Sequence, residues 1–296
     1  MISTRWKRVT AWAAGMAVLL VTQAWAADLS AEQIVANNVA ARGGLEAWRK
    51  IQTMLWTGHL QSSHTQMPSM VFIMQQKRPN KVRFDISTVG QKSVRIFDGE
   101  RGWKIKPSRE GGPEIQPYPP EEVKYAQAAQ VIDGPLIDYV AKGNAVTLES
   151  LDEMDGHKVY RLSVHLGSGE TDRVWIDAKS FLEVRYDRPV SSAPGAANVS
   201  VFYGNYQTFA GLRLPTVIQT ATAPGMPPDQ MVIEKVMLNA PVDERSFSPP
   251  GARSLRGSPP TSGQLPAPQR PKKLPPLLRS MEAPAAPSAG PASGPN

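Results

Sequence analysis

Residues capable of acid–base or metal chemistry are few in this sequence, and their spacing is unfavourable. The four histidines are His59, His64, His157 and His165. His59 and His64 are five residues apart and would face opposite sides of one strand, while His157 and His165 would share a face roughly 26 Å apart at strand rise. Neither pair can hold a metal ion without help from distant residues. The sequence therefore predicts no metal site and no cofactor.

Patterns for nucleophilic catalysis and phosphate binding are also missing from the sequence. There is no HExxH, no GxSxG and no glycine-rich phosphate loop. Ser168 stands between two glycines, which fits the tip of a hairpin better than a nucleophile. The acidic residues within 149–155 do not follow the spacing of a calcium loop, and a solvated turn is favoured. We therefore expect a protein that is not an enzyme, with an envelope hydrolase as the disfavoured alternative.

The positive charge of the chain is concentrated at its two ends. The 296 residues carry a formal net charge of +7. Residues 1–26 contribute +3 and residues 248–296 contribute +5, so residues 27–247 are close to neutral. Nucleic-acid binding usually requires a basic surface on the folded domain. This distribution predicts that the folded part does not bind nucleic acid.

The first 26 residues have the organisation of a signal peptide. Arg5, Lys7 and Arg8 precede the apolar run 11–21, and small residues stand at −3 and −1 of a cleavage site after Ala26. A retained anchor is the alternative, but eleven apolar residues fall short of the ~20 needed to span a bilayer. With no Cys in the chain, the mature protein can be neither disulfide-bonded nor lipidated on cysteine. We expect it in the periplasm.

The last 45 residues, 252–296, have the composition of a disordered tail. Of the 28 prolines, 13 lie after Phe247, mixed with Ala, Ser and Gly. Residues 268–278 could form a polyproline II docking segment, although a flexible spacer is the favoured interpretation. The basic charge of the tail would favour weak contact with anionic envelope surfaces.

Between the two ends, hydrophobicity alternates with a period of two. Val82, Phe84 and Ile86 alternate with charged neighbours, and the same alternation recurs near Trp103 and through residues 160–166. Short turn signals such as Asp-Gly and Pro-Asn separate these runs. We predict a mainly β domain over residues 27–251, an unclosed antiparallel β half-barrel of about 11–12 strands with a few helices plugging its concave face.

Helices are predicted at three places. Ser30 and Gln33 form a capping box for a helix over 30–41, a short turn follows over 45–50, and a proline-led helix is predicted over 119–131. Beyond a break at 133–135, an apolar stripe at helical spacing consists of Leu136, Ile137 and Val140. This stripe is consistent with ordinary core packing and also with a movable lid, residues 119–142, over a cavity.

The apolar residues of the β region are of an adaptable kind. Methionines suit surfaces that accept variable apolar shapes, and each methylene moved out of water gains ~0.8 kcal/mol. Methionines that fill an irregular core are the alternative interpretation. The concave face of a curved, exported half-barrel would be a natural container for acyl chains, and we predict a cavity there beneath the lid. The predicted lining is Met70, Phe72, Met74, Val82, Phe84, Ile96, Trp103 and Ile105.

Three segments carry a family resemblance. Residues 77–84 read KRPNKVRF, residues 96–103 read IFDGERGW, and residues 243–251 hold a D-x-x-x-F followed by Pro-Pro-Gly. Together they resemble the paired signature and closing region of the LolA-type periplasmic lipoprotein carriers. The likeness covers about residues 29–251. A longer polar insertion at 106–118 and the proline-rich tail depart from the family pattern.

This resemblance implies a function in lipid handling. The interior would hold the acyl chains of a lipoprotein on its way from an inner-membrane donor complex to an outer-membrane acceptor, and the carrier would be a monomer. Residues 134–137 resemble the lid segment of the family, and Arg78 would latch the lid through hydrogen bonds to its backbone. An ordinary surface salt bridge of Arg78 is the alternative. A sensor or scaffold that binds a protein partner with the same half-barrel is the alternative function.

Overall fold

The structure is a computed structural model, and it describes residues 29–62, 69–108, 112–129, 132–190, 197–222 and 227–249. The predicted signal peptide (1–26) and tail (252–296) lie outside the described residues. The described part contains one large sheet and three short α-helices.

The sheet contains thirteen antiparallel strands and is not closed into a barrel, which confirms the predicted fold class. One more strand than expected lies in the polar insertion, where β6 pairs with β5. In chain order the strands are β1 (Thr53–Gln61), β2 (Met70–Lys77), β3 (Lys81–Thr88), β4 (Gln91–Phe97), β5 (Gly102–Pro107), β6 (Pro113–Pro117), β7 (Ala145–Met154), β8 (His157–His165), β9 (Thr171–Asp177), β10 (Glu183–Val190), β11 (Ala197–Phe209), β12 (Leu212–Ala221) and β13 (Asp229–Leu238).

Two meanders make up this sheet, and they meet at a single pair of strands. Strands β1 to β6 follow one another outward on one side, β7 to β13 do so on the other, and β1 pairs with β13. The junction has a bulge between Thr57 and Gly58. A Cβ at Gly58 would lie 2.0 Å from the carbonyl oxygen of Val232, so only glycine fits this crossing.

The helices begin and end near the predicted positions. Helix α1 (Ala31–Ala41) starts with the capping box of Ser30 and Gln33, and α2 (Leu45–Arg49) follows it. Helix α3 (Pro120–Ala128) has proline at its start, and a 3₁₀ helix, η1 (Glu244–Phe247), ends the described chain. Residues 132–143 form a series of turns instead of the expected helix, because Asp138 has a φ of 54° that interrupts the helical path.

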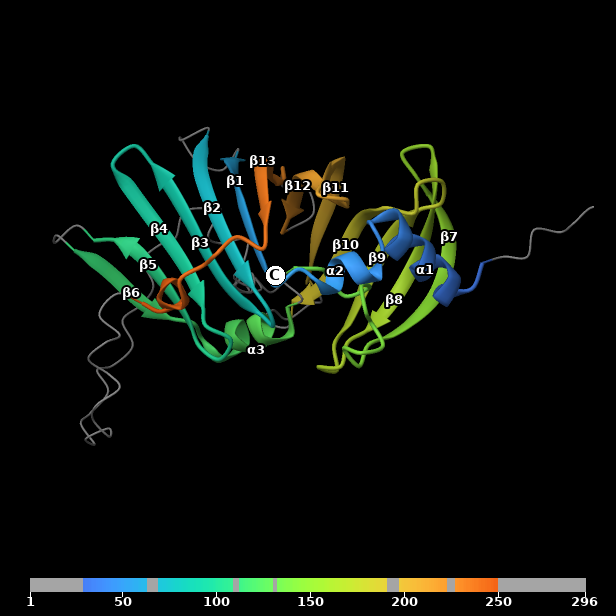
Figure 1. The fold of residues 1–296 in the computed structure, drawn as a ribbon, viewed down its shortest axis with the longest axis horizontal. Coiled ribbons are helices and arrows are strands. Elements are labelled where there is room, and N and C mark those ends of the chain that lie inside the picture. Colours follow the sequence, from blue (N-terminus) through green and yellow to red (C-terminus); the bar gives the residue numbers. More distant parts are fainter. Residues whose placement is uncertain are drawn as a thin grey trace, which may run out of the picture.

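The helices α1 and α2 define the inner face of the curved sheet (Figure 1). Helix α1 packs on β8 and β9 through Ile34 and Val35, and α2 packs on β1 and β12 through Trp48. On the outer face, Phe247 of η1 is buried against β4 and β5. Figure 1 shows α1 and α2 in front of the half that carries β7–β10, and α3 at the lower edge of the other half.

Candidate functional site

An apolar surface follows the inner face of β13, β1, β2 and β3. Strand pairing sets Val236 opposite Trp56, Trp56 opposite Met74, and Met74 opposite Phe84. All four side chains are partly exposed. We call this surface the apolar groove. Its partly exposed members are Trp56, Met74, Val82, Phe84, Ile218, Met231 and Val236.

Strand residues alone form the floor beneath the groove. Phe72 is almost fully buried there, with its ring centroid 5.8 Å from that of Phe84. Leu60, Met70 and Ile86 complete this cluster, and no residue of the described helices belongs to it. Trp56 and Val236 also pack against the cluster that contains Trp48 of α2, so helical cover in the described chain reaches this end of the groove. The part of the groove around Met74 and Phe84 packs on a cluster of strand residues.

Five of the eight residues predicted to line the acyl cavity share this face, namely Met70, Phe72, Met74, Val82 and Phe84. The prediction is wrong for Ile96, Trp103 and Ile105. Phe84 is paired with Arg95, so the side chain of Ile96 lies on the opposite face of β4. The three residues pack on the outer face against Phe247 and Val242. Alternation could not reveal the error, because both faces of β4 and β5 are covered.

A buried charged cluster lies at the far end of the groove. Arg95 and Lys104 are neighbours on the inner face of β4 and β5, and each lies 2.6 Å from a carboxylate oxygen of Glu122 in α3. All three side chains are about 5–6% exposed. This cluster is not among the residues expected from the sequence, because Arg95 and Lys104 have the alternation typical of charged residues on a solvent-facing side of a strand.

Helix α3 also contacts the other half of the sheet. Lys124 forms a 2.6 Å ion pair with Glu170 in the β8–β9 turn, and this ion pair holds the pKa of Glu170 below its usual value. The guanidinium of Arg188 in β10 lies 3.9 Å from the ring centroid of Tyr125. Because the side chain of Lys124 is 66% exposed, this attachment is weaker than the buried cluster on β4 and β5. Helix α3 thus links the two halves, firmly on one side and loosely on the other.

Asp172 is a buried acid on the inner face of β9, next to Tyr186 of β10. Burial raises the pKa of Asp172 to about 6, against the effects of a hydrogen bond from the Tyr186 hydroxyl and the charge of Arg188. Burial also raises the pKa of Tyr186, which keeps its hydroxyl protonated as the donor. The ionised form of Asp172 is therefore costly to the folded state at neutral pH.

The Asp172→Asn variant should gain stability over the wild type as pH rises. The folded pKa lies above the unfolded value of 3.8, so the proton of Asp172 stabilises the fold below about pH 4, and this contribution is lost as pH passes 6. We expect equal stability near pH 4 and an advantage of about 2 to 3 kcal/mol for the variant at pH 7.5. Urea unfolding of both proteins across this range measures the difference, and a pH-independent difference would contradict the assignment.

The predicted lid residues have three different environments. Leu136 is fully buried with α1 and β8, and Ile137 is fully buried with Trp48 and Leu214. Val140 is 72% exposed, so its predicted place above the cavity is wrong. The positive φ of Asp138 turns the chain between Ile137 and Val140, which removes the helical stripe. Residues 132–143 form a plug in the core rather than a cover of the apolar groove.

Arg78 joins this plug to α2, but not in the predicted way. Its Nη2 donates to the side chain of Asp133 at 2.6 Å and to the carbonyl of Trp48 at 3.2 Å, and its Nε donates to the carbonyl of Ile51 at 2.7 Å. The expected hydrogen bond to the plug backbone comes instead from Arg42, which donates to the carbonyl of Asp133 at 3.1 Å. The alternative for Arg78 is an ordinary surface salt bridge. Arg78 does form a salt bridge, with Asp133, but its side chain is only 25% exposed and that of Asp133 only 4%.

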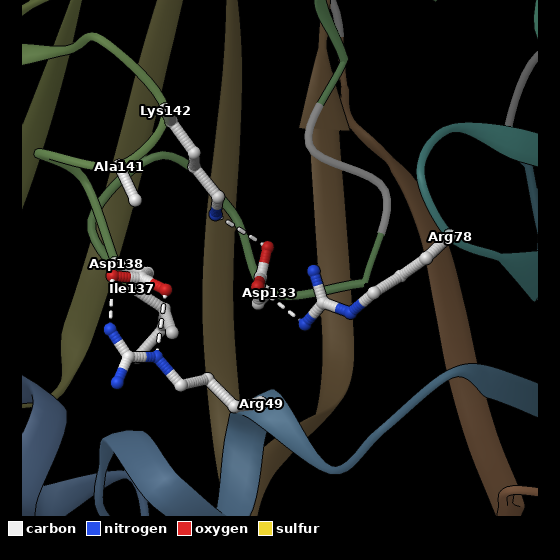
Figure 2. A pocket seen from close by; sticks show the side chains of 7 residues that line it. All are labelled: Arg49, Arg78, Asp133, Ile137, Asp138, Ala141 and Lys142. Atoms are coloured by element: carbon white, nitrogen blue, oxygen red, sulfur yellow. Dashed lines mark hydrogen bonds and ion pairs between the residues drawn. The ribbon is translucent and has the colours of Figure 1, made fainter.

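A cavity of about 260 Å³ lies beside Arg78 (Figure 2). Figure 2 shows Arg78, Arg49 and Lys142 reaching toward two aspartates from three sides. Arg49 forms two hydrogen bonds of 2.9 Å with Asp138, which lower the pKa of that carboxyl group. The lining is Arg49, Arg78, Asp133, Ile137, Asp138, Ala141 and Lys142. Five of these seven residues are charged, and the cavity belongs to the plug, not to the predicted acyl lining.

No group of three or more His, Cys, Asp or Glu side chains in the described ranges is arranged to hold a metal ion. Among the same residues, no helix has both the length and the apolar composition needed to cross a bilayer.

Comparison with known proteins gives matches only among solved structures. No family model and no curated protein matches the sequence. A LolA superfamily protein from Nitrosomonas europaea aligns with 75% of this chain and 98% of its own, at 11% identity and a TM-score of 0.49. A DUF1329 family protein from Desulfovibrio piger covers 74% and 97% at 11% identity and a TM-score of 0.48. A putative outer membrane lipoprotein-sorting protein domain from Vibrio parahaemolyticus covers 73% and 94% at 10% identity and a TM-score of 0.41. Each of these three structures is aligned over at least 94% of its own length.

Proposed function

We propose that the protein binds a hydrophobic ligand, an acyl chain, in the apolar groove. One observation supports this above all: partly exposed Met and Phe side chains stand next to one another on a part of the inner face where, among the described residues, they pack on strand residues. Contiguous apolar side chains on a concave face are typical of sites that bind apolar ligands. Met74 and Met231 add side chains that adapt to ligands of different shape.

We further propose that the ligand is the acyl portion of a lipoprotein or another lipid, carried through the periplasm toward the outer membrane. Motifs 77–84, 96–103 and 243–251 support this finer role through their resemblance to LolA-type carriers. The carrier role includes an inner-membrane donor complex and an outer-membrane acceptor as partners. It requires no cofactor and no catalytic step.

Lipid extraction of the purified mature protein, followed by mass spectrometry, tests the proposal directly. We expect co-purifying acylated molecules, and we expect the delipidated protein to bind a fluorescent long-chain fatty acid with micromolar or better affinity. A protein free of lipid that binds no fatty acid would contradict the proposed function. Co-purification of a stoichiometric protein without lipid would favour the sensor or scaffold alternative instead.

Helix α3 is held on Arg95, next to Phe84 at one end of the groove, so its loose attachment to the β8–β9 turn should affect how fast a ligand leaves past that end. The Lys124→Glu variant turns the attraction to Glu170 into repulsion, so α3 should separate more readily from the β8–β9 turn. Exposed ion pairs contribute about 0.2 to 1 kcal/mol, which corresponds to an up to about 5-fold faster release of the fluorescent fatty acid. Stopped-flow displacement measures this rate. The double variant Lys124→Glu/Glu170→Lys should restore the slow rate, and equally fast release from it would exclude the ion pair as the cause.

A further inference from the structure

A cavity lined mainly by charged side chains lies beside the plug. Neither the proposed ligand binding in the groove nor the packing of the sheet accounts for it. It lies between the end of α2, the end of β2 and residues 132–143, and it measures about 260 Å³. A buried water occupies roughly 30 Å³, so the space exceeds the needs of one or two waters. Three cationic side chains and two aspartates line it.

Both central cations of the cavity are held rigidly and keep a donor unused. Arg78 is fixed by Ile51, Trp48 and Asp133 through its Nε and Nη2, while its Nη1 has no acceptor among the described residues. Lys142 donates to Asp133 at 2.6 Å and to the carbonyl of Gly134 at 2.7 Å, which leaves one of its three hydrogens. Figure 2 shows the two side chains approaching Asp133 from opposite sides.

Arg78 and Lys142 share the single carboxylate of Asp133, while the neighbouring Arg42 is paired with Glu183 at 2.9 Å. Burial lowers the pKa of Lys142, the Asp133 carboxylate opposes this effect, and the charges of Arg78 and Arg42 lower the pKa further. Asp138 is already engaged by both hydrogen bonds from Arg49. A second anion close to Arg78 and Lys142 would therefore be stabilised by two cations that share one buried carboxylate.

We propose that this cavity binds a phosphate group, with Arg78 Nη1 and Lys142 Nζ as the donors to its oxygens. Arginine and lysine are the side chains that proteins use most for phosphate, and charge-assisted hydrogen bonds of this type are among the stronger ones. The phosphate belongs either to a free ion or to a phosphorylated lipid head group. The site stands on its own contacts and does not depend on ligand binding in the apolar groove.

Calorimetric titration of the purified protein with inorganic phosphate at low ionic strength tests the site. We expect saturable binding by the wild type and at least 10-fold weaker binding by Lys142→Met, which keeps the apolar stem and leaves Asp133 paired with Arg78. The matched control is Lys81→Met. Lys81 shares the carboxylate of Glu244 with Lys77 on the outer face, so this variant removes one of two cations in the same way, away from the cavity. The control should bind phosphate as the wild type does.

A second variant should change affinity in the opposite direction. Asp133→Asn frees Arg78 and Lys142 from their shared carboxylate, so phosphate should bind at least 10-fold more tightly than to the wild type. A purely structural role of these residues predicts no such gain. Absence of binding to the wild type at millimolar phosphate, or equal affinity of the wild type and Lys142→Met, would overturn the site.

The same titration with monododecyl phosphate identifies the source of the phosphate. Binding more than 10-fold tighter than that of inorganic phosphate, and lost in Lys142→Met, assigns the site to a lipid head group. Equal affinity for the two compounds assigns it to the free ion. In either case the fatty-acid measurement on the groove remains a separate test, because it uses a ligand without phosphate.

Discussion

The Glu122→Ala variant should lose about 3 to 5 kcal/mol of unfolding free energy, the largest stability effect that we expect from a single side chain. Glu122 is the carboxylate between Arg95 and Lys104, and all three groups are buried. Its removal leaves two cations next to each other in a region of low polarity. Water cannot solvate them there without opening the contact between α3 and the sheet.

Chemical denaturation of the variant and the wild type at pH 7 measures this loss. Glu121→Ala is the matched control, because Glu121 precedes Glu122 on the same helical turn and is exposed. We expect the control to change stability by less than about 0.5 kcal/mol. A loss in Glu122→Ala no larger than that of the control would show that the ion cluster does not hold α3 on the sheet.

The Met74→Glu variant should bind the fluorescent fatty acid at least 30-fold more weakly than the wild type. Met74 lies at the centre of the apolar groove, between Trp56 on β1 and Phe84 on β3. A carboxylate beneath a bound acyl chain has no cation opposite it and must be desolvated, which costs at least about 2 kcal/mol. Phe84→Glu is a less suitable test, because Phe84 lies opposite Arg95, which could pair with the new carboxylate.

Ile73→Glu is the matched control for this measurement. Ile73 is the neighbour of Met74 on β2, its side chain lies on the outer face, and it is 40% exposed. The same charge on the same strand should therefore leave fatty-acid affinity within about 2-fold of the wild type. Equal losses in both variants would indicate that damage to the strand, rather than the charge in the groove, reduces binding.

Strand alternation predicts only part of the inner face from the sequence. In β3 the apolar Val82 and Phe84 alternate with charged residues and share a face with Met74 of β2. The other residues of the groove were not among the predicted lining, namely Trp56, Ile218, Met231 and Val236. In β4 and β5 the outward residues Ile96 and Ile105 are as apolar as core residues, because η1 covers them. That cover comes from a segment about 140 residues further along the chain, and local periodicity contains no information about it.

The predicted lid shows a different limit of sequence analysis. Leu136, Ile137 and Val140 have helical spacing, but a single residue, Asp138, adopts a left-handed conformation and turns Val140 outward. Asp tolerates this conformation better than most residues, yet nothing in the spacing requires it. The charged cluster of Glu122 was missed for another reason, since it joins residues of β4, β5 and α3 that only the tertiary fold brings together.

The single junction between β1 and β13 has a consequence for folding kinetics. Within each meander, every strand pairs with a strand that is close in the chain, so hairpins can form early and independently. The junction pairs Met54 with Leu238, about 180 residues apart in the chain. Closing a loop of this length costs conformational entropy before any contact of the junction forms. We therefore expect the pairing of β1 with β13 to form late in folding, and the glycine at the bulge lies within that pairing.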